Sequence, residues 1–314
     1  MAEEKKVIIT QSMMKSFYEY YHDNECGLVF VEKYINKRYD LFKASDVQQV
    51  GNWFEYQCIG ATTKSSVVPQ PEKTKQGELT APYKKMQGHI QNFKNFMTIY
   101  GIEVISVQEK LTVGETTIML TNEKGEEVPF IIDGLEGTTD VICKAKYDIK
   151  GTYEFKDDFG KETIRTEERI IINAGEEFIM DIKTTGLLDD KWNSYGWDIP
   201  SLHTKEKIVR QPIHYKYLSM LKYGKQYKFL FLLFSQTNDY DFRSILFNID
   251  EDQHIKEHEE FIVWTNKWIK YFLKVGFKAN PDVIRCHGCA LKLGCKHFMA
   301  VPKIQIFDYQ PQKK

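Results

Sequence analysis

The sequence predicts a mixed α/β (α+β) protein in which helices flank a central set of strands. Two observations lead to this fold class. Apolar side chains recur at helical spacing near both ends of the chain, and they alternate with polar side chains through much of the middle. Helices, strands, a helix, strands and a final helix therefore follow one another, which is the order expected of a layered α/β or α+β core.

The N-terminal third is predicted to contain three helices. They are expected over Gln11–Tyr21, Ser45–Ile59 and Pro82–Tyr100. Ser45 or Asp46 can cap the second helix, and Gly101 ends the third. The segment Ala61–Ala81 is rich in polar residues and proline, so it is expected to be a loop.

Alternating side chains predict strands through the middle of the chain. They are expected over Ile102–Glu109, Thr116–Thr121, Val128–Asp133, Thr139–Tyr147, Thr163–Ile172 and Glu177–Lys183. Asp189–Pro200 is expected to be an aromatic loop. A helix should start near Gln211 and reach Tyr223, with Pro212 in its first turn, where a missing N–H costs little. Two strands and a long helix complete the fold, over Tyr227–Gln236, Phe242–Ile249 and Glu251–Lys274.

The composition is that of an ordinary globular protein. Of 314 residues, 42% are hydrophobic and 28% are charged. Because 43 Lys and Arg oppose 44 Asp and Glu, a nucleic-acid partner would be held by local basic patches and not by an overall field. The N-terminus is charged where a signal peptide would be apolar, and the longest apolar run, Phe229–Phe234, is too short to span a bilayer. The expected location is therefore cytoplasmic (intracellular), with no membrane partner.

The densest chemical signal is a group of cysteines near the C-terminus. Cys286, Cys289 and Cys295 have C-x2-C-x5-C spacing in a chain with only six cysteines. Thiolates separated by two residues can bind one metal ion, and in a reducing compartment such spacing favours metal ligation over disulfides. A tetrahedral site needs a fourth ligand, for which the candidates are Cys26, Cys58, Cys143, His287 and His297.

A second signal is a carboxylate and an ammonium group at the end of a predicted strand. Asp181 and Lys183 share one face of that strand because side chains alternate with a period of two. The pair suits metal-assisted phosphodiester hydrolysis, in which a carboxylate holds a divalent ion and a lysine steadies the attacking water or the developing charge. Alone the pattern is weak, since composition predicts about six acid-x-base triplets by chance.

Three other groups accompany this pair along the chain. Gly137-Thr138-Thr139-Asp140 places a carboxylate at the start of a strand, Gln211 and Tyr215 lie four residues apart on one helical face, and Glu55 lies on a predicted helix. In this order the pieces resemble the RecB-type branch of the PD-(D/E)xK nuclease superfamily. Its pattern is a helical Glu or His, a G-x-x-D strand, a D-x-K strand and a Q-x-x-x-Y helix. Its iron–sulfur members, including the AddB nuclease domain and the CRISPR adaptation nuclease, also have an N-terminal Cys and a C-terminal C-x2-C-x5-C.

The resemblance implies a restriction-endonuclease-like fold. This is a mixed central sheet flanked by helices, with the N- and C-terminal segments joined by a metal cluster. The implied organisation is a single nuclease domain over 1–314, with a cluster-bearing flank of 1–50 plus 275–300 and a catalytic core of 51–250. An inserted hairpin at about 147–174 would account for the long stretch between Asp140 and Asp181.

The resemblance also implies a role for each candidate site residue. Mg²⁺ or Mn²⁺ would be bound by Glu55, Asp140, Asp181 and the backbone carbonyl of Ile182. Lys183 would be the catalytic lysine, and Gln211 and Tyr215 would position DNA or the catalytic shell. A 4Fe-4S cluster would be bound by Cys26, Cys286, Cys289 and Cys295, with Zn²⁺ as the alternative metal.

Several positions depart from the family pattern or leave a choice open. Gly27 follows Cys26 where the family often has Pro, and Glu55 stands where several members have His. Asp133 is the alternative second carboxylate, and Glu109 is a candidate auxiliary acid.

The implied function is that of a metal-dependent DNA nuclease, expected to be an exonuclease on single-stranded DNA or duplex ends. A helicase or a recombination, CRISPR or phage protein is a candidate partner. Seven Lys or Arg against one acid in His203–Lys228 favour phosphate contacts, and Trp192, Tyr195 and Trp197 are candidates to stack on unpaired bases. The alternatives are a non-catalytic DNA-binding or recombination scaffold with a nuclease fold, and a zinc-stabilised interaction protein.

Overall fold

The computed structural model describes residues 6–23, 25–61, 68–155, 165–186, 188, 202–247, 251–281 and 286–298. The chain divides into two compact units. The larger unit consists of Ile8–Gln11 and Ala44–Val263, and the smaller unit consists of Met1–Val7, Ser12–Lys43 and Trp264–Lys314. The assignment of the whole chain to a single nuclease domain, with the flank and core given above, stays a prediction.

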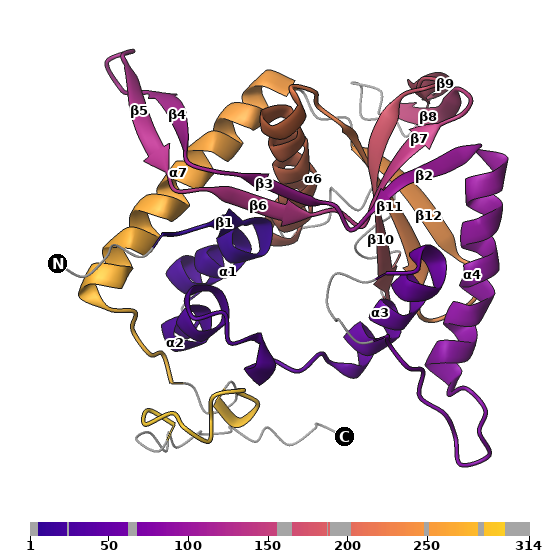
Figure 1. The fold of residues 1–314 in the computed structure, drawn as a ribbon, viewed down its shortest axis with the longest axis horizontal. Coiled ribbons are helices and arrows are strands. Elements are labelled where there is room, and N and C mark those ends of the chain that lie inside the picture. Colours follow the sequence, from indigo (N-terminus) through magenta and orange to yellow (C-terminus); the bar gives the residue numbers. More distant parts are fainter. Residues whose placement is uncertain are drawn as a thin grey trace, which may run out of the picture. The chain divides into compact units, whose positions relative to one another are not determined.

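The larger unit is built around a mixed five-stranded sheet with the strand order β12, β11, β10, β7, β2 (Figure 1). Its strands are β2 (Ile102–Val107), β7 (Val141–Ala145), β10 (Glu177–Thr185), β11 (Lys228–Ser235) and β12 (Phe242–Phe247). Strands β10 and β11 are parallel, and the other neighbouring pairs are antiparallel. This mixed sheet with its helices agrees with the predicted α/β (α+β) class.

Helices α3 (Asp46–Ile59) and α4 (Ala81–Ile99) pack on one face of this sheet. Ser45 caps α3 in a capping box with Gln48, which selects Ser45 over Asp46 as the cap residue. The core beneath the two helices contains buried side chains from both helices and from alternate strand positions, among them Phe54, Met86, Phe178, Met180 and Ile182. Alternation along β10 therefore fixes which of its side chains face the core.

The larger unit has three further groups of strands. One is a three-stranded sheet in the order β1 (Ile9–Thr10), β6 (Leu135–Thr138), β3 (Lys110–Val113). The others are two antiparallel hairpins, β4 (Thr116–Thr121) with β5 (Glu127–Ile132), and β8 (Ile149–Phe155) with β9 (Arg165–Ile172). The β4–β5 hairpin extends beyond β3 and β6 (Figure 1). The sequence patterns do not indicate β1, β3 or β6, whose strands have only two to four residues.

Helix α6 runs from Leu202 to Tyr223, so the prediction that it starts near Gln211 is wrong. Pro212 lies inside the helix instead of in its first turn. An internal proline removes one backbone hydrogen bond and costs about 3 kcal/mol, but burial of apolar neighbours can offset such a local penalty. Ile213, Tyr217 and Leu218 are all buried and supply that burial here.

The smaller unit has an aromatic core. It contains most of α1 (Gln11–His22), α2 (Gly27–Phe30), the π-helical turn η1 (Val31–Ile35), the 3-10 turn η2 (Tyr39–Leu41) and the C-terminal part of α7 (Glu251–Val275). The ring of Phe17 lies 5.4 Å from Trp264, 5.5 Å from Phe30 and 6.5 Å from Phe277. These contacts hold α1 against the end of α7. None of the helices in the described ranges is long and apolar enough to cross a bilayer.

Two buried histidines connect α6 to α7 within the larger unit. Nε2 of His214 lies 3.1 Å from the carbonyl oxygen of Glu136, and Nδ1 lies 3.2 Å from Nε2 of His258. A carbonyl only accepts hydrogen bonds, so Nε2 of His214 carries the proton and Nδ1 accepts from His258. Burial lowers the pKa of His214 to about 4 and lowers the pKa of His258 well below its ordinary value.

We expect this pair to make the fold sensitive to mild acid. An unfolded histidine titrates near pH 6.5, so below that pH the unfolded state binds protons that the folded state excludes until about pH 4. Each such proton costs about 1.4 kcal/mol of stability per pH unit, and stability falls as pH falls. His258→Gln keeps an amide donor for His214 but has no group that titrates in this range. The Tm of this variant should therefore fall less between pH 7.5 and pH 5.5 than the Tm of the wild type.

The control for this prediction is His254→Gln on the same helix, because the side chain of His254 is 41% exposed. Differential scanning calorimetry of the three proteins at both pH values gives the comparison. Equal losses of Tm in the wild type and His258→Gln would show that the buried pair does not set the acid response.

Candidate active site

Strand β10 carries the predicted carboxylate and lysine on one face at the centre of the sheet. Asp181 is 3% exposed and lies opposite Phe231 of β11, while Lys183 lies opposite Leu233. Nζ of Lys183 forms an ion pair with Oδ2 of Asp181 at 2.5 Å. The intervening residue, Ile182, faces the core beneath α3 and α4. The period of the strand thus places a charged pair on the face opposite that core.

Asp140 lies next to this pair, immediately before β7. Its side chain is buried, and Oδ2 accepts a hydrogen bond from the backbone N–H of Ile182 at 2.8 Å. The last paired residues of β7 and β10 are Val141 and Met180. Just beyond this pair, the hydrogen bond between the two segments is made by the Asp140 side chain. The structure therefore brings Asp140, the first-choice second carboxylate, to β10.

The three charged groups interact strongly. Burial alone would lower the pKa of Lys183, but the carboxylates of Asp181 and Asp140 outweigh burial and raise that pKa above its ordinary value. Lys183 therefore stays protonated at neutral pH. Two formal negative charges and one positive charge share a largely buried site, which leaves an unbalanced negative charge.

Helix α6 brings Gln211 and Tyr215 to the same place. Nε2 of Gln211 donates to Oδ1 of Asp181 at 2.7 Å, and the hydroxyl of Tyr215 donates to the carbonyl oxygen of Thr138 at 2.7 Å. A Cβ atom on Gly137 would lie 2.7 Å from the Tyr215 ring, so only glycine leaves room for it. Burial, and then the carboxylates of Asp181 and Asp140, raise the pKa of Tyr215, which keeps its hydroxyl protonated.

Glu55 reaches the site region from α3. The helix approaches β10 closely, since a Cβ atom on Gly51 would lie 2.9 Å from Oγ1 of Thr184. Glu55 lies one turn further along and is only 5% exposed. Its Oε1 accepts a hydrogen bond from Nε2 of Gln108 at 3.0 Å. Gln108 falls inside the predicted strand Ile102–Glu109, whereas the observed strand β2 ends at Val107. Alternation along that segment does not mark Gln108 as a site residue.

No group of three or more His, Cys, Asp or Glu side chains within the described ranges is arranged to hold a metal ion as it stands. A pair of carboxylates still suits Mg²⁺, which usually keeps several water ligands and is bound by one or two carboxylates. Asp140 and Asp181 offer hard oxygen donors and an unbalanced negative charge. The donor set at β10 therefore fits a divalent cation that retains much of its hydration.

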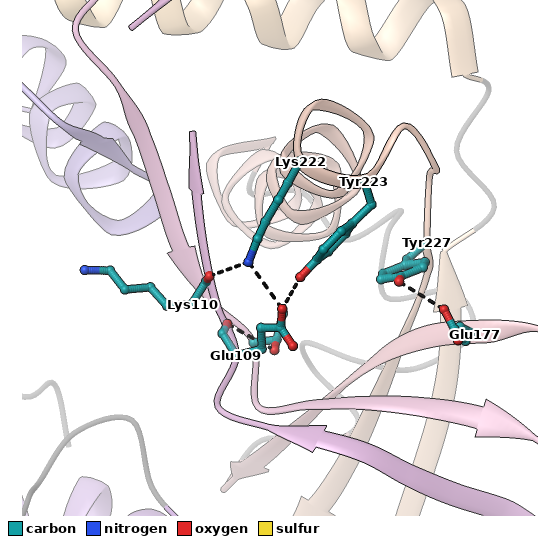
Figure 2. Close-up of polar contacts among 7 residues, drawn as sticks. Glu109, Lys110, Glu177, Lys222, Tyr223 and Tyr227 are labelled. Carbon is teal, nitrogen blue, oxygen red and sulfur yellow. Dashed lines mark hydrogen bonds and ion pairs between the residues drawn. The ribbon is translucent and has the colours of Figure 1, made fainter. Parts of the chain in front are cut away.

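The predicted basic segment does not form an open patch where its side chains are described. Nζ of Lys222 lies 3.2 Å from Oε1 of Glu109, which also accepts from the hydroxyl of Tyr223 (Figure 2). Lys225 pairs with Glu177 at 3.4 Å and Lys228 with Glu176 at 3.0 Å, and the guanidinium of Arg210 lies 3.9 Å from the centre of the Phe261 ring. Acids from other elements thus offset much of the local charge. Tyr227 also donates to Glu177 (Figure 2).

Four cysteines interact within the smaller unit. Burial raises the pKa of Cys289, and the charges of Cys26, Cys286 and Cys295 raise it further. Sγ of Cys289 also accepts the backbone N–H of Leu291 at 3.4 Å. Of the candidate fourth ligands, Cys26 lies close enough to affect Cys289, but these four described cysteines do not form a metal-binding group as they stand. The two other cysteines lie in the larger unit, where Cys143 is fully buried in β7 and Cys58 packs against the core from α3.

Gly27 has a structural reason to be glycine, at the position where the RecB-type pattern often has proline. Its N–H donates to the carbonyl oxygen of Lys278 at 3.0 Å, a bond that proline lacks the hydrogen to make. A Cβ atom at this position would lie 2.7 Å from the same oxygen and 2.8 Å from the ring of Tyr20. The residue after Cys26 thus ties this cysteine's segment to the chain that leads to the C-terminal motif.

The predicted aromatic loop with Trp192, Tyr195 and Trp197 lies outside the described residues, as do the side chains of Lys205 and Lys207. Glu109, the candidate auxiliary acid, faces Lys222 and Tyr223, and Asp133 lies in the turn between β5 and β6.

No protein-family model matches the chain, and no curated protein matches it. The structure of SSO0001 aligns over 95% of this chain and 88% of that chain at 11% identity, with a TM-score of only 0.29. A crystal structure described as "Putative exonuclease", from Eubacterium rectale, aligns over 96% of this chain and 91% of that chain. Its TM-score is 0.52 and its sequence identity is 16%, so the likeness concerns the fold alone. The chain therefore shares the overall fold of that protein.

Proposed function

We propose that this protein is a metal-dependent DNA nuclease of restriction-endonuclease-like fold that hydrolyses phosphodiester bonds. The observation that carries the proposal is the buried group of Asp140, Asp181 and Lys183, tied to α6 through Gln211. Two carboxylates and a protonated lysine on one sheet face match the needs of phosphodiester hydrolysis. The crystal structure described as "Putative exonuclease" shares the fold of this chain, and we extend the proposal to an exonuclease that acts on single strands or duplex ends.

The cation would be held by Asp140 and Asp181, with the carbonyl oxygen of Ile182 and with Glu55 as the further acid. When bound, Mg²⁺ or Mn²⁺ supplies a Lewis acid that lowers the pKa of water and stabilises the leaving oxygen. The hydrogen bond from the Ile182 N–H fixes one oxygen of Asp140, and the Gln211 amide fixes one oxygen of Asp181. These bonds hold both carboxylates in place before any ligand arrives.

The remaining residues act on charge and orientation. The raised pKa of Lys183 keeps an ammonium group beside the carboxylates, where it can offset the negative charge that develops on the phosphate during hydrolysis. Tyr215 holds the Thr138 carbonyl, and so orients the segment that leads to Asp140. Gln211 and Tyr215 thus position the carboxylates from one face of α6.

The smaller unit would carry a 4Fe-4S cluster on Cys26, Cys286, Cys289 and Cys295. The support is the C-x2-C-x5-C spacing, the closeness of Cys26, Cys286 and Cys295 to Cys289, and the N–H that Sγ of Cys289 accepts from Leu291. Zn²⁺ is the alternative, since four cysteines also suit a structural zinc site. A helicase, recombination, CRISPR or phage protein is a candidate partner for delivering DNA ends.

The test is cleavage of end-labelled DNA by protein purified without oxygen. Single-stranded DNA and linear duplex should be degraded with Mg²⁺ or Mn²⁺ and left intact with EDTA, while closed circular duplex should resist. Cutting of the closed circle would replace the exonuclease assignment with an endonuclease. No cleavage of any substrate by a metal-loaded protein would favour the non-catalytic scaffold.

A further inference from the structure

Gln108, between β2 and β3, has an unusual backbone conformation. Its φ angle is +54°, in the left-handed region that favours glycine and, to a lesser degree, asparagine. Among the non-glycine residues that the structure describes, only Lys37 shares this property. Such strain persists where surrounding contacts fix the conformation, and it concentrates at functional sites.

The left-handed backbone lets Gln108 contact two candidate site residues at once. Its N–H donates to the carbonyl oxygen of Asp140 at 2.8 Å, and its side-chain Nε2 donates to Oε1 of Glu55 at 3.0 Å. Glu55 comes from α3, and Asp140 comes from the segment before β7. Gln108 therefore bridges two elements that carry carboxylates.

The next residue, Glu109, holds this conformation in place. Its carbonyl oxygen accepts the N–H of Thr139 at 3.0 Å, which fixes its backbone beside Asp140. Its carboxylate accepts from Tyr223 and Lys222 at the end of α6 (Figure 2). Contacts from two elements thus keep the backbone around Gln108 from relaxing.

We infer that Gln108 is a positioning residue that sets the carboxylate of Glu55 relative to Asp140 for divalent-cation binding, an inference that rests on the nuclease function proposed above. An amide is suited to this role because it fixes the carboxylate with a hydrogen bond and adds no positive charge. A lysine or arginine in its place would neutralise Glu55 and weaken its attraction for a cation. Outer-shell hydrogen bonds of this kind typically change metal affinity or activity 10- to 100-fold.

Two substitutions separate the amide from the backbone strain. Gln108→Met keeps the length of the side chain without its donor, and Gln108→Gly removes the donor but accepts the positive φ. Both should weaken Mn²⁺ binding, measured by titration calorimetry, by about 10- to 100-fold. The Mg²⁺ concentration for half-maximal cleavage should rise by a similar factor. Lys37→Gly relieves the same backbone strain outside the proposed site and should keep wild-type Mn²⁺ affinity.

A third substitution gives a readout that a purely structural role would not change. In Gln108→Glu two carboxylates face each other, and the lost hydrogen bond returns when they share a proton. Its cleavage rate relative to the wild type should therefore rise as pH falls from 8 to 6. The same ratio for Gln108→Met should not depend on pH, because methionine has no proton to share.

Wild-type protein that neither binds Mn²⁺ nor cleaves DNA would overturn the proposed function and this inference with it. Wild-type protein that does both, beside Gln108→Met and Gln108→Gly of unchanged Mn²⁺ affinity, would overturn the inference alone. Weakened binding in those two variants, at wild-type affinity in Lys37→Gly, would support it. A Tm for Gln108→Gly at or above that of Gln108→Met would show that the loss does not come from unfolding.

Discussion

Asp181→Asn is expected to lower the rate of DNA cleavage by about a thousandfold while the protein stays folded. Asparagine has nearly the same shape and keeps an oxygen that can accept the hydrogen bond from Gln211. It removes the negative charge through which β10 would hold a divalent ion. Removing one group that stabilises charge in an active site commonly costs 10²- to 10³-fold in kcat, and losing a metal ligand also removes activation of the water.

Substitutions of Asp181 and Lys183 should differ in their effect on the free energy of unfolding. Asp140 and Asp181 carry two negative charges against the one positive charge of Lys183, so Asp181→Asn removes one of two neighbouring carboxylates and keeps Asp140 beside the ammonium group. It should therefore change the free energy of unfolding less than Lys183→Met does. Lys183→Met leaves two neighbouring carboxylates without their ammonium group. Its cost should be about 1–3 kcal/mol, below the usual figure for a broken buried pair because the Lys183 side chain is 34% exposed.

Single-turnover cleavage of end-labelled single strands and calorimetric Tm values test both expectations. Glu177→Gln is the matched control, since Glu177 lies on the same strand but pairs with Tyr227 and Lys225. It should cleave at the wild-type rate. Cleavage by Asp181→Asn within tenfold of the wild type would remove Asp181 from the reaction, and equal stabilities of Asp181→Asn and Lys183→Met would contradict the charge argument.

The residues that meet at β10 could be predicted because local periodicity determines their directions. A strand period of two puts Asp181 and Lys183 on one face, and a four-residue helical spacing puts Gln211 and Tyr215 on one face. Each of these pairs is fixed by its own element. The predicted start of α6 near Gln211 is wrong because it depends only on the local penalty of Pro212. Burial of neighbouring side chains, which only the folded chain provides, offsets that penalty.

The features that sequence could not provide depend on contacts between distant segments. The bond from Gln108 to Glu55 joins residues 53 positions apart through a side chain and a left-handed backbone, neither of which leaves a periodic pattern. Strands β1, β3 and β6 are too short to alternate visibly. The basic segment looked like a phosphate-binding patch because the acids that pair with it, Glu109 and Glu177, come from other strands.

Cys286→Ala is expected to lose the metal that we propose for the smaller unit and to unfold at a markedly lower temperature. A cluster that joins Cys26 to Cys286 closes a loop of about 260 residues. Loop-closure entropy makes such a crosslink worth about 5 kcal/mol. At about 1.5 °C per kcal/mol for a protein of this size, the Tm should fall by about 8 °C. Cys26→Ser should behave alike, because it breaks the same connection from its other end.

Iron, sulfide and zinc analysis of protein purified without oxygen, together with calorimetry, decides among the outcomes. Cys58→Ala is the matched control, since Cys58 packs against the core of the larger unit and should keep wild-type metal content. Iron and sulfide that disappear together in Cys286→Ala and Cys26→Ser would establish the cluster. If the protein contains one zinc per chain and the same variants lose it, the crosslink exists and its metal is zinc. Wild-type metal content in Cys286→Ala would end the proposal, because a ligand required to close the loop cannot be dispensable for binding.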